Sequence, residues 1–124
     1  MRRLLIGASL LALLSGTARA DDADAHMNNL RVYAHLTTLA VRAQKVCRDV
    51  EIDQKAVDAF RRIMGFDADD AIDLKIAIIY AGYYLQKADK DLLEIGTRKW
   101  CRVVVESLGP GSRANLLVRR GESM

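Results

Sequence analysis

The stretch Arg98–Arg102 (RKWCR) places a thiol beside the only tryptophan of the chain and between cationic side chains. The chain has one other cysteine, Cys47. Cys101 is therefore a reactive thiol, a metal ligand or one half of a disulfide. The class of function depends on the answer, and a disulfide would join the C-terminal part of the chain to a segment 54 positions earlier, 101 minus 47.

The first twenty residues have the three parts of a secretory signal peptide. Arg2 and Arg3 precede an apolar run at 4–14, and small residues follow up to Ala18-Arg19-Ala20. The run is shorter than the about 20 residues that a membrane-spanning helix needs. We therefore predict cleavage after Ala20 and export of a soluble chain, without an integral membrane segment, that is periplasmic or secreted.

Loss of the signal peptide changes the net charge. The 19 Lys and Arg residues exceed the 16 Asp and Glu residues by three, and the predicted signal peptide contains three of the arginines. The mature chain is then neutral, which gives no support for nucleic-acid binding. We expect residues 21–27 to form a flexible acidic leader. Residues 109–124, with the basic Arg113, Arg119 and Arg120, should form a tail with a short turn or helix.

Composition and hydrophobic periodicity favour an all-α fold, because the chain has one proline, few aromatic residues and many helix formers. Apolar residues recur at helical spacing in four segments within 28–108. The expected helices run from Asn28 or Asn29 to about Arg48, from a cap at Asp53 to Gly65, from Asp69 or Asp70 onward, and from a cap at Asp89 to Leu108.

Only the segment 87–91 (KADKD) separates the last two predicted helices, so they form either two helices or one long bent helix. We expect a small four-helix bundle, or a three-helix bundle in which one helix is long and bent. The third helix is apolar on most sides, which predicts that it lies at the centre of the bundle.

The two cysteines are best explained by a disulfide. An exported chain with two cysteines usually oxidises them, and a loop of this length stabilises the folded state by about 4 kcal/mol. A redox thiol would have a close C-x-x-C partner, and a zinc site that used His26 and His35 would need short paired spacings. We therefore predict a Cys47–Cys101 disulfide, with no metal and no cofactor.

No catalytic motif is recognisable, so we expect a protein that is not an enzyme and has no catalytic residues. Tyr80, Tyr83 and Tyr84 are spaced i, i+3 and i+4 on the third predicted helix. They could line a small apolar pocket, or pack in the core with Phe60 and Trp100. No exposed aromatic or arginine cluster stands out as an interface anchor.

The chain resembles two groups of proteins. A signal peptide, Cys47 in the first helix, and Cys101 followed by Glu106-Ser107 and a GxxxxLL-like end at 111–117 resemble small exported two-cysteine helical bacterial proteins grouped as domains of unknown function. The chain is also similar to the HdeA/HdeB family of periplasmic acid-stress chaperones, which are small, helical and held by one disulfide of similar span. That family has a tryptophan before its first cysteine, whereas Trp100 precedes the second one here. The resemblance implies roles for the two cysteines alone, as disulfide partners.

Two functional hypotheses follow. The first is a folded helical module of the periplasm that binds another protein or an envelope component. The second is an acid-activated chaperone, in which protonation of carboxylates opens the bundle and exposes its apolar faces. The charge balance of the mature chain permits this, because protonation of its 16 acidic residues would leave a strongly positive, self-repelling molecule.

Overall fold

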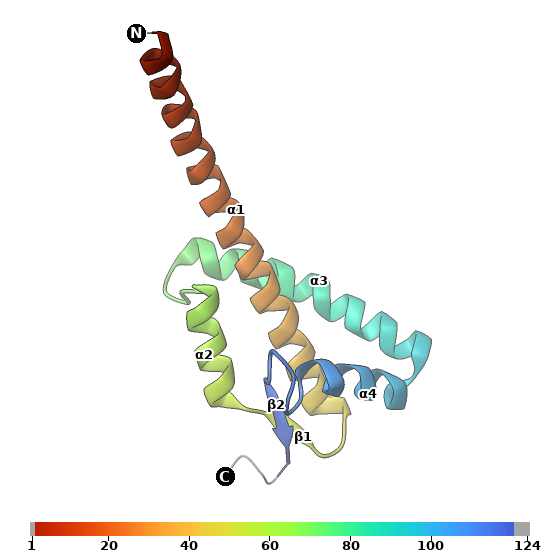
Figure 1. Cartoon of the computed structure of the whole chain (residues 1–124). Coiled ribbons are helices and arrows are strands. Elements are labelled where there is room, and N and C mark those ends of the chain that lie inside the picture. Colours follow the sequence, from red (N-terminus) through yellow and green to blue (C-terminus); the bar gives the residue numbers. More distant parts are fainter. Residues whose placement is uncertain (1, 121–124) are drawn as a thin grey trace.

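The computed structural model describes the backbone of residues 2–120 and the side chains from residue 22 onward. The described chain is mostly helical, which confirms the predicted all-α class, and it also contains a small two-stranded sheet (Figure 1). In chain order the elements are α1 (Arg2–Val46), β1 (Val50–Ile52), α2 (Gln54–Met64), α3 (Ala71–Ile95), α4 (Thr97–Leu108) and β2 (Leu117–Arg119).

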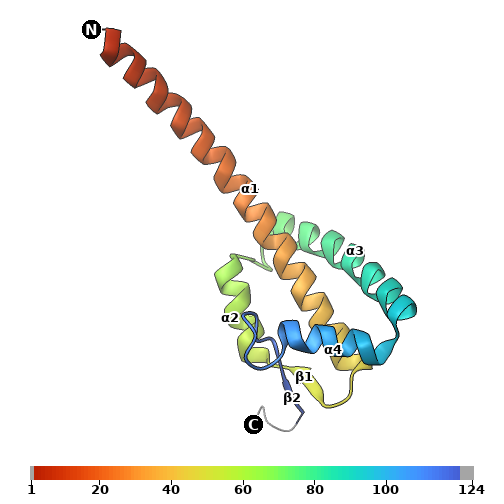
Figure 2. The same ribbon diagram turned by 45° about the vertical axis from the view of Figure 1, so that its right-hand side comes forward.

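Helix α1 is the centre of the fold. Its C-terminal half contacts α2, α3, α4 and β1, and the other helices lie around it (Figures 1 and 2). Alanines on α1, among them Ala34, Ala40 and Ala43, are fully or almost fully buried, and their small side chains let neighbouring elements approach closely. The prediction of a central third helix is wrong, because α3 packs one side against α1 and leaves its other sides exposed.

The N-terminal half of α1 extends beyond the other elements in both views (Figures 1 and 2). Residues 2–20 of the predicted signal peptide fall here, whereas residue 1 and the side chains of 2–20 lie outside the part of the structure that is described. Residues 21–27, for which we expected a flexible leader, are helical, and His26 within them contacts α3. Among the described residues, no helix is both long and apolar enough to cross a membrane.

Local capping explains where α2 and α3 begin and end. The Asp53 carboxylate accepts a hydrogen bond from the Ala56 amide at 3.2 Å, and α2 ends at Gly65, as predicted. The Asp70 carboxylate caps α3 in the same way. The end of α3 differs from the prediction, because 87–91 is helical throughout and the chain bends at Gly96, whose φ of 86° suits glycine.

Asp89 consequently lies inside α3 and caps no helix. Its carboxylate pairs with Arg42 of α1 at 2.8 Å. The neighbouring Lys87–Asp91 pair, at 3.4 Å, has the i, i+4 spacing that supports a continuous helix. The segment that we expected to separate two helices therefore stabilises one helix, and α3 and α4 are separate helices joined at Gly96.

The tail forms a strand, so the predicted short helix or turn is wrong for 117–119. Strands β1 and β2 are antiparallel, with Val50 opposite Arg119 and Ile52 opposite Leu117. Two further backbone hydrogen bonds of 2.8 Å, Asp53 N–H to the Leu116 carbonyl and Arg120 N–H to that of Asp49, flank the pairing. Three-residue strands are too short for a period of two to be recognised in the sequence.

The core lies where the C-terminal end of α1 meets α4 and the sheet. Trp100 and Leu108 of α4 pack there with Leu116 and Leu117, all of them at most 3% exposed. Cys47 and Cys101 join the same region through a disulfide, with a Cα–Cα distance of 5.7 Å. The tail is thus part of the core, because Leu116 and Leu117 complete it.

Candidate functional site

The disulfide settles the question raised by Cys101. Both cysteines are bonded, which confirms the predicted pairing and removes the reactive-thiol and metal-ligand interpretations. His26 and His35, the other ligands considered for zinc, lie on α1 and contact α3. Among the described residues, no group of three or more His, Cys, Asp or Glu side chains could hold a metal ion.

The five aromatic residues singled out in the sequence do not form one pocket. Trp100 and Tyr84 are buried at 3% and 8% exposure, whereas Tyr83 is 62% exposed and stands edge-on to Tyr84. Tyr80 is half-buried on α3, and Phe60 packs against the core from α2. A cavity of about 370 Å³ between α1, α3 and α4 is lined by Tyr84 and Trp100, without the other three.

A hydrogen bond between the side chains of His26 and Asp73 holds the start of α3 against α1. The Asp73 carboxylate is buried, lies 2.9 Å from His26 Nε2 and accepts a 3.3 Å hydrogen bond from the Asp67 amide. The hydrogen bond from His26 lowers the pKa of Asp73, which outweighs the opposite effect of burial. The sequence shows only that Asp73 follows the helix cap and that His26 lies in an acidic segment, so their contact was not predictable.

Nine residues further along α1, His35 stacks on Tyr84 with 4.0 Å between the ring centroids. The Tyr84 hydroxyl also accepts a hydrogen bond of 3.0 Å from Arg31. Burial lowers the pKa of His35, and the positive charges of Arg31 and Lys87 lower it further. The α1–α3 interface therefore contains two groups, Asp73 and His35, whose protonation opposes its packing.

The side of α3 that faces away from α1 carries several exposed apolar side chains. We define the outer face of α3 by the residues that share this side at helical spacing: Ile72, Lys75, Ile79, Tyr83, Gln86, Lys90 and Leu93. Its apolar members are exposed by between 62% and 89%. Exposed large apolar side chains that gather on one side of a helix, with polar side chains among them, are typical of a binding site.

A shallow groove adjoins this face between α1 and α3. It has a volume of about 420 Å³ and is lined by Thr37, Thr38, Val41, Ile78, Ala81, Gly82 and Leu85. A Cβ atom at Gly82 would have no neighbour within 4 Å, so the packing of the described residues does not require a glycine there. Sequence reasoning missed this surface because it assigned the apolar residues of α3 to the core.

Comparison of the chain with protein-family models, with curated proteins and with solved structures finds no match. The resemblances to exported two-cysteine proteins and to the HdeA/HdeB family therefore stay predictions.

Proposed function

We propose that this protein is an exported, non-enzymatic protein-binding module of the periplasm, and that it binds its partner through the outer face of α3. The observation that carries the proposal is the row of exposed apolar side chains on this face. The disulfide supports export, because such bonds persist in oxidising compartments.

The apolar side chains of the outer face are too numerous to be incidental. Ile72 and Ile79 lie two turns apart and Tyr83 one turn further along, each more than 60% exposed, while the opposite side of α3 is buried against α1. Covering each such side chain contributes on the order of 1 kcal/mol to association. A partner that covers the row would gain several such contributions, as in helix-in-groove recognition.

The charges on the outer face favour a partner with acidic residues over a second copy of this chain. The charged members of the face, Lys75 and Lys90, are both cationic and exposed, and Glu94, 3.9 Å from Lys90, offsets the charge of Lys90 in part. An antiparallel second copy that placed Ile72 opposite Leu93 would also place Lys75 opposite Lys90. A parallel two-fold pair would place each lysine opposite itself, so self-association meets like-charge repulsion in either case.

Site-specific photo-crosslinking in living cells tests the proposal. A photoreactive residue replaces Ile79 on the outer face or, as the control, Lys55, which is exposed on α2. We expect adducts with another exported protein from position 79 alone. The substitutions Lys75→Glu and Lys90→Glu should weaken these adducts, whereas Lys45→Glu and Lys55→Glu should not, because the latter pair leaves the face intact.

Three results would overturn the proposal. Equal labelling from both positions would show non-specific contact, and absence of adducts would show that no partner covers the face. Adducts that join two copies of this chain, unaffected by the lysine substitutions, would show that the face is a self-association surface.

A second candidate function, an acid-activated chaperone, is favoured by one observation at the α1–α3 interface. Protonation of Asp73 would weaken its contact with His26, and protonation of His35 would add a third positive charge near Arg31 and Lys87. Release of α3 from α1 would then expose the side of α3 that includes Tyr84.

An acid titration of the oxidised chain from about pH 7 to about pH 2 tests the second candidate. Helix content, binding of an apolar dye and suppression of the aggregation of a periplasmic client are followed together. Dye binding and client protection that appear together below about pH 4, near the ordinary carboxyl pKa values, would support it. A bundle that stays packed, or that opens without protecting the client, would refute it.

A further inference from the structure

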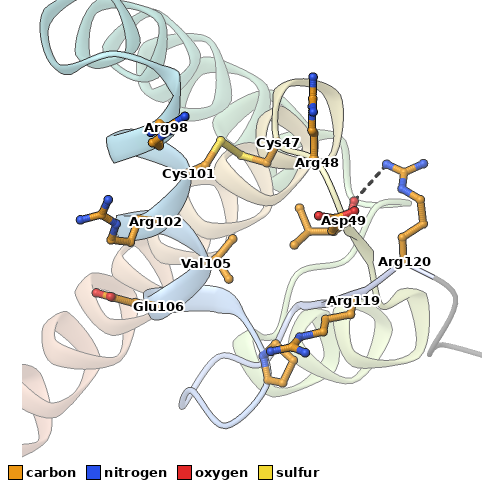
Figure 3. A pocket seen from close by; sticks show the side chains of 12 residues that line it. Cys47, Arg48, Asp49, Arg98, Cys101, Arg102, Val105, Glu106, Arg119 and Arg120 are labelled. Carbon is orange, nitrogen blue, oxygen red and sulfur yellow. Dashed lines mark hydrogen bonds between the residues drawn. A yellow bond between two sulfur atoms is a disulfide. The ribbon is translucent and has the colours of Figure 1, made fainter.

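A second surface, separate from the outer face of α3, lies beside the disulfide. It is a cavity of about 1050 Å³ between the end of α1, the side of α4 and strand β2 (Figure 3). Its lining contains five arginines from three segments: Arg48, Arg98, Arg102, Arg119 and Arg120. We call it the arginine cavity. No such cluster is apparent in the sequence, because folding brings together residues up to 72 positions apart, 120 minus 48.

The positive charge of the arginine cavity is only partly compensated. Its acidic lining residues are Asp49 and Glu106, and Glu106 extends from the outer side of α4 in Figure 3. Among the described residues, four of the arginines form no side-chain hydrogen bond or ion pair: Arg48, Arg98, Arg102 and Arg119. Arg102 extends from the same side of α4 as Glu106 (Figure 3), so the guanidinium groups available to an anion are those of Arg48, Arg98 and Arg119.

The framework of the cavity is held in place by bonds between its walls. The Cys47–Cys101 disulfide joins the end of α1 to α4. The paired strands join the segment after α1 to the tail, and Arg120 donates a 3.1 Å hydrogen bond to the Val50 carbonyl. A framework that is fixed before binding reduces the cost of ordering the site around a ligand.

We propose that the arginine cavity binds a phosphorylated organic molecule that carries more than one negative charge. Guanidinium groups match phosphate oxygens in pairs of parallel hydrogen bonds. The cavity is far larger than one phosphate group and has the size of sites that hold organic ligands. Val50, Val105 and Pro110 provide apolar surface for the rest of the molecule.

The phosphate groups could belong to a soluble phosphate ester or to the headgroup of a membrane lipid, and two sets of probes distinguish these sources. The purified, oxidised chain is titrated by calorimetry with inorganic phosphate and with inorganic pyrophosphate. In parallel, its flotation is measured with phosphatidylcholine vesicles that contain or lack phosphatidylglycerol. Saturable binding of pyrophosphate indicates a soluble ligand, and binding confined to the phosphatidylglycerol vesicles indicates a headgroup.

Matched double variants connect binding to the cavity. The variant Arg98→Gln/Arg119→Gln removes charges from opposite sides of the cavity (Figure 3). The control Arg62→Gln/Arg113→Gln removes the same charge from exposed positions outside the lining. We expect the first variant to lose at least about tenfold in affinity, as expected for charge-assisted hydrogen bonds. The control should change by less than about twofold.

Several results would overturn the proposal. These are an absence of binding to every probe, equal losses in the two double variants, and binding of a glutamate-rich peptide without binding of pyrophosphate or vesicles. All four substituted side chains are exposed, so both variants should retain the wild-type melting curve. If Arg98→Gln/Arg119→Gln melts at a lower temperature than the wild type, the single variant Arg48→Gln replaces it. An unchanged affinity of Arg48→Gln would then count against the proposal.

Discussion

The disulfide should contribute a large part of the stability of this small domain. Cys47 and Cys101 close a loop of 54 residues, and the chain-entropy model for a loop of that length gives about 4 kcal/mol. The total stability of a domain of this size is typically about 5–15 kcal/mol. Removal of the bond should therefore leave a protein that is folded marginally or not at all at 37 °C.

Urea unfolding of three samples measures this contribution. The samples are the oxidised chain, the same chain after reduction, and the double variant Cys47→Ala/Cys101→Ala. With a slope of about 2 kcal/mol per molar urea, the midpoint should fall by about 2 M on reduction. The urea midpoint of the double variant should be slightly lower still, because Cys47 is buried and its truncation also removes contacts in the core.

Comparison of the reduced chain with the double variant separates the cross-link from side-chain packing. A midpoint shift below about 0.5 M on reduction would refute the reasoning, because it corresponds to about 1 kcal/mol. It would mean that the unfolded chain already holds the two segments close together, or that the folded core is equally stable without the bond.

Three further predictions concern individual side chains. Leu117→Ala should destabilise the fold by about 2–5 kcal/mol, because Leu117 is fully buried. Chemical denaturation with Val118→Ala, a half-buried position on the same strand, as the control checks this. The low pKa of His35 means that the unfolded chain binds more protons than the folded one as the pH falls below about 6.5, so folding stability should decrease there. The variant His35→Phe keeps a ring to stack on Tyr84, so it should lose less stability than the wild type between about pH 7.5 and about pH 5.5. An equal loss in the two proteins would show that His35 is not its cause. Gly82→Ala should raise stability by about 0.5–1 kcal/mol in thermal melts, because alanine favours helix and its Cβ meets no neighbour. A lower melting temperature would contradict this.

Those features of the fold that depend on nearby residues could be predicted from the sequence. The Asp53 cap and the Gly65 stop define α2 by local hydrogen bonding, and both are found as predicted. The disulfide followed from the predicted signal peptide and from the presence of only two cysteines. Each of these inferences needs only the chemistry of one segment, or the count of one residue type.

Features that depend on which surfaces meet could not be predicted in the same way. The apolar residues of α3 show a helix, but helical periodicity does not reveal whether a neighbour covers each side. Placement of α3 at the centre was therefore wrong, and its exposed face was missed. The β1–β2 pairing and the arginine cavity are non-local in the same sense, because their parts lie far apart in the chain.

The exposed face of α3 and the disulfide are connected through the stability of the domain. Apolar side chains such as Ile79 and Leu93 remain on the surface, so they add little to the core of a chain that is already short. Gly82 weakens α3 further without a packing reason among the described residues. The covalent bond, at the C-terminal end of α1, offsets these losses. If the outer face serves binding, Gly82→Ala should raise stability and, by adding a methyl group to the groove beside that face, reduce the crosslinking from position 79.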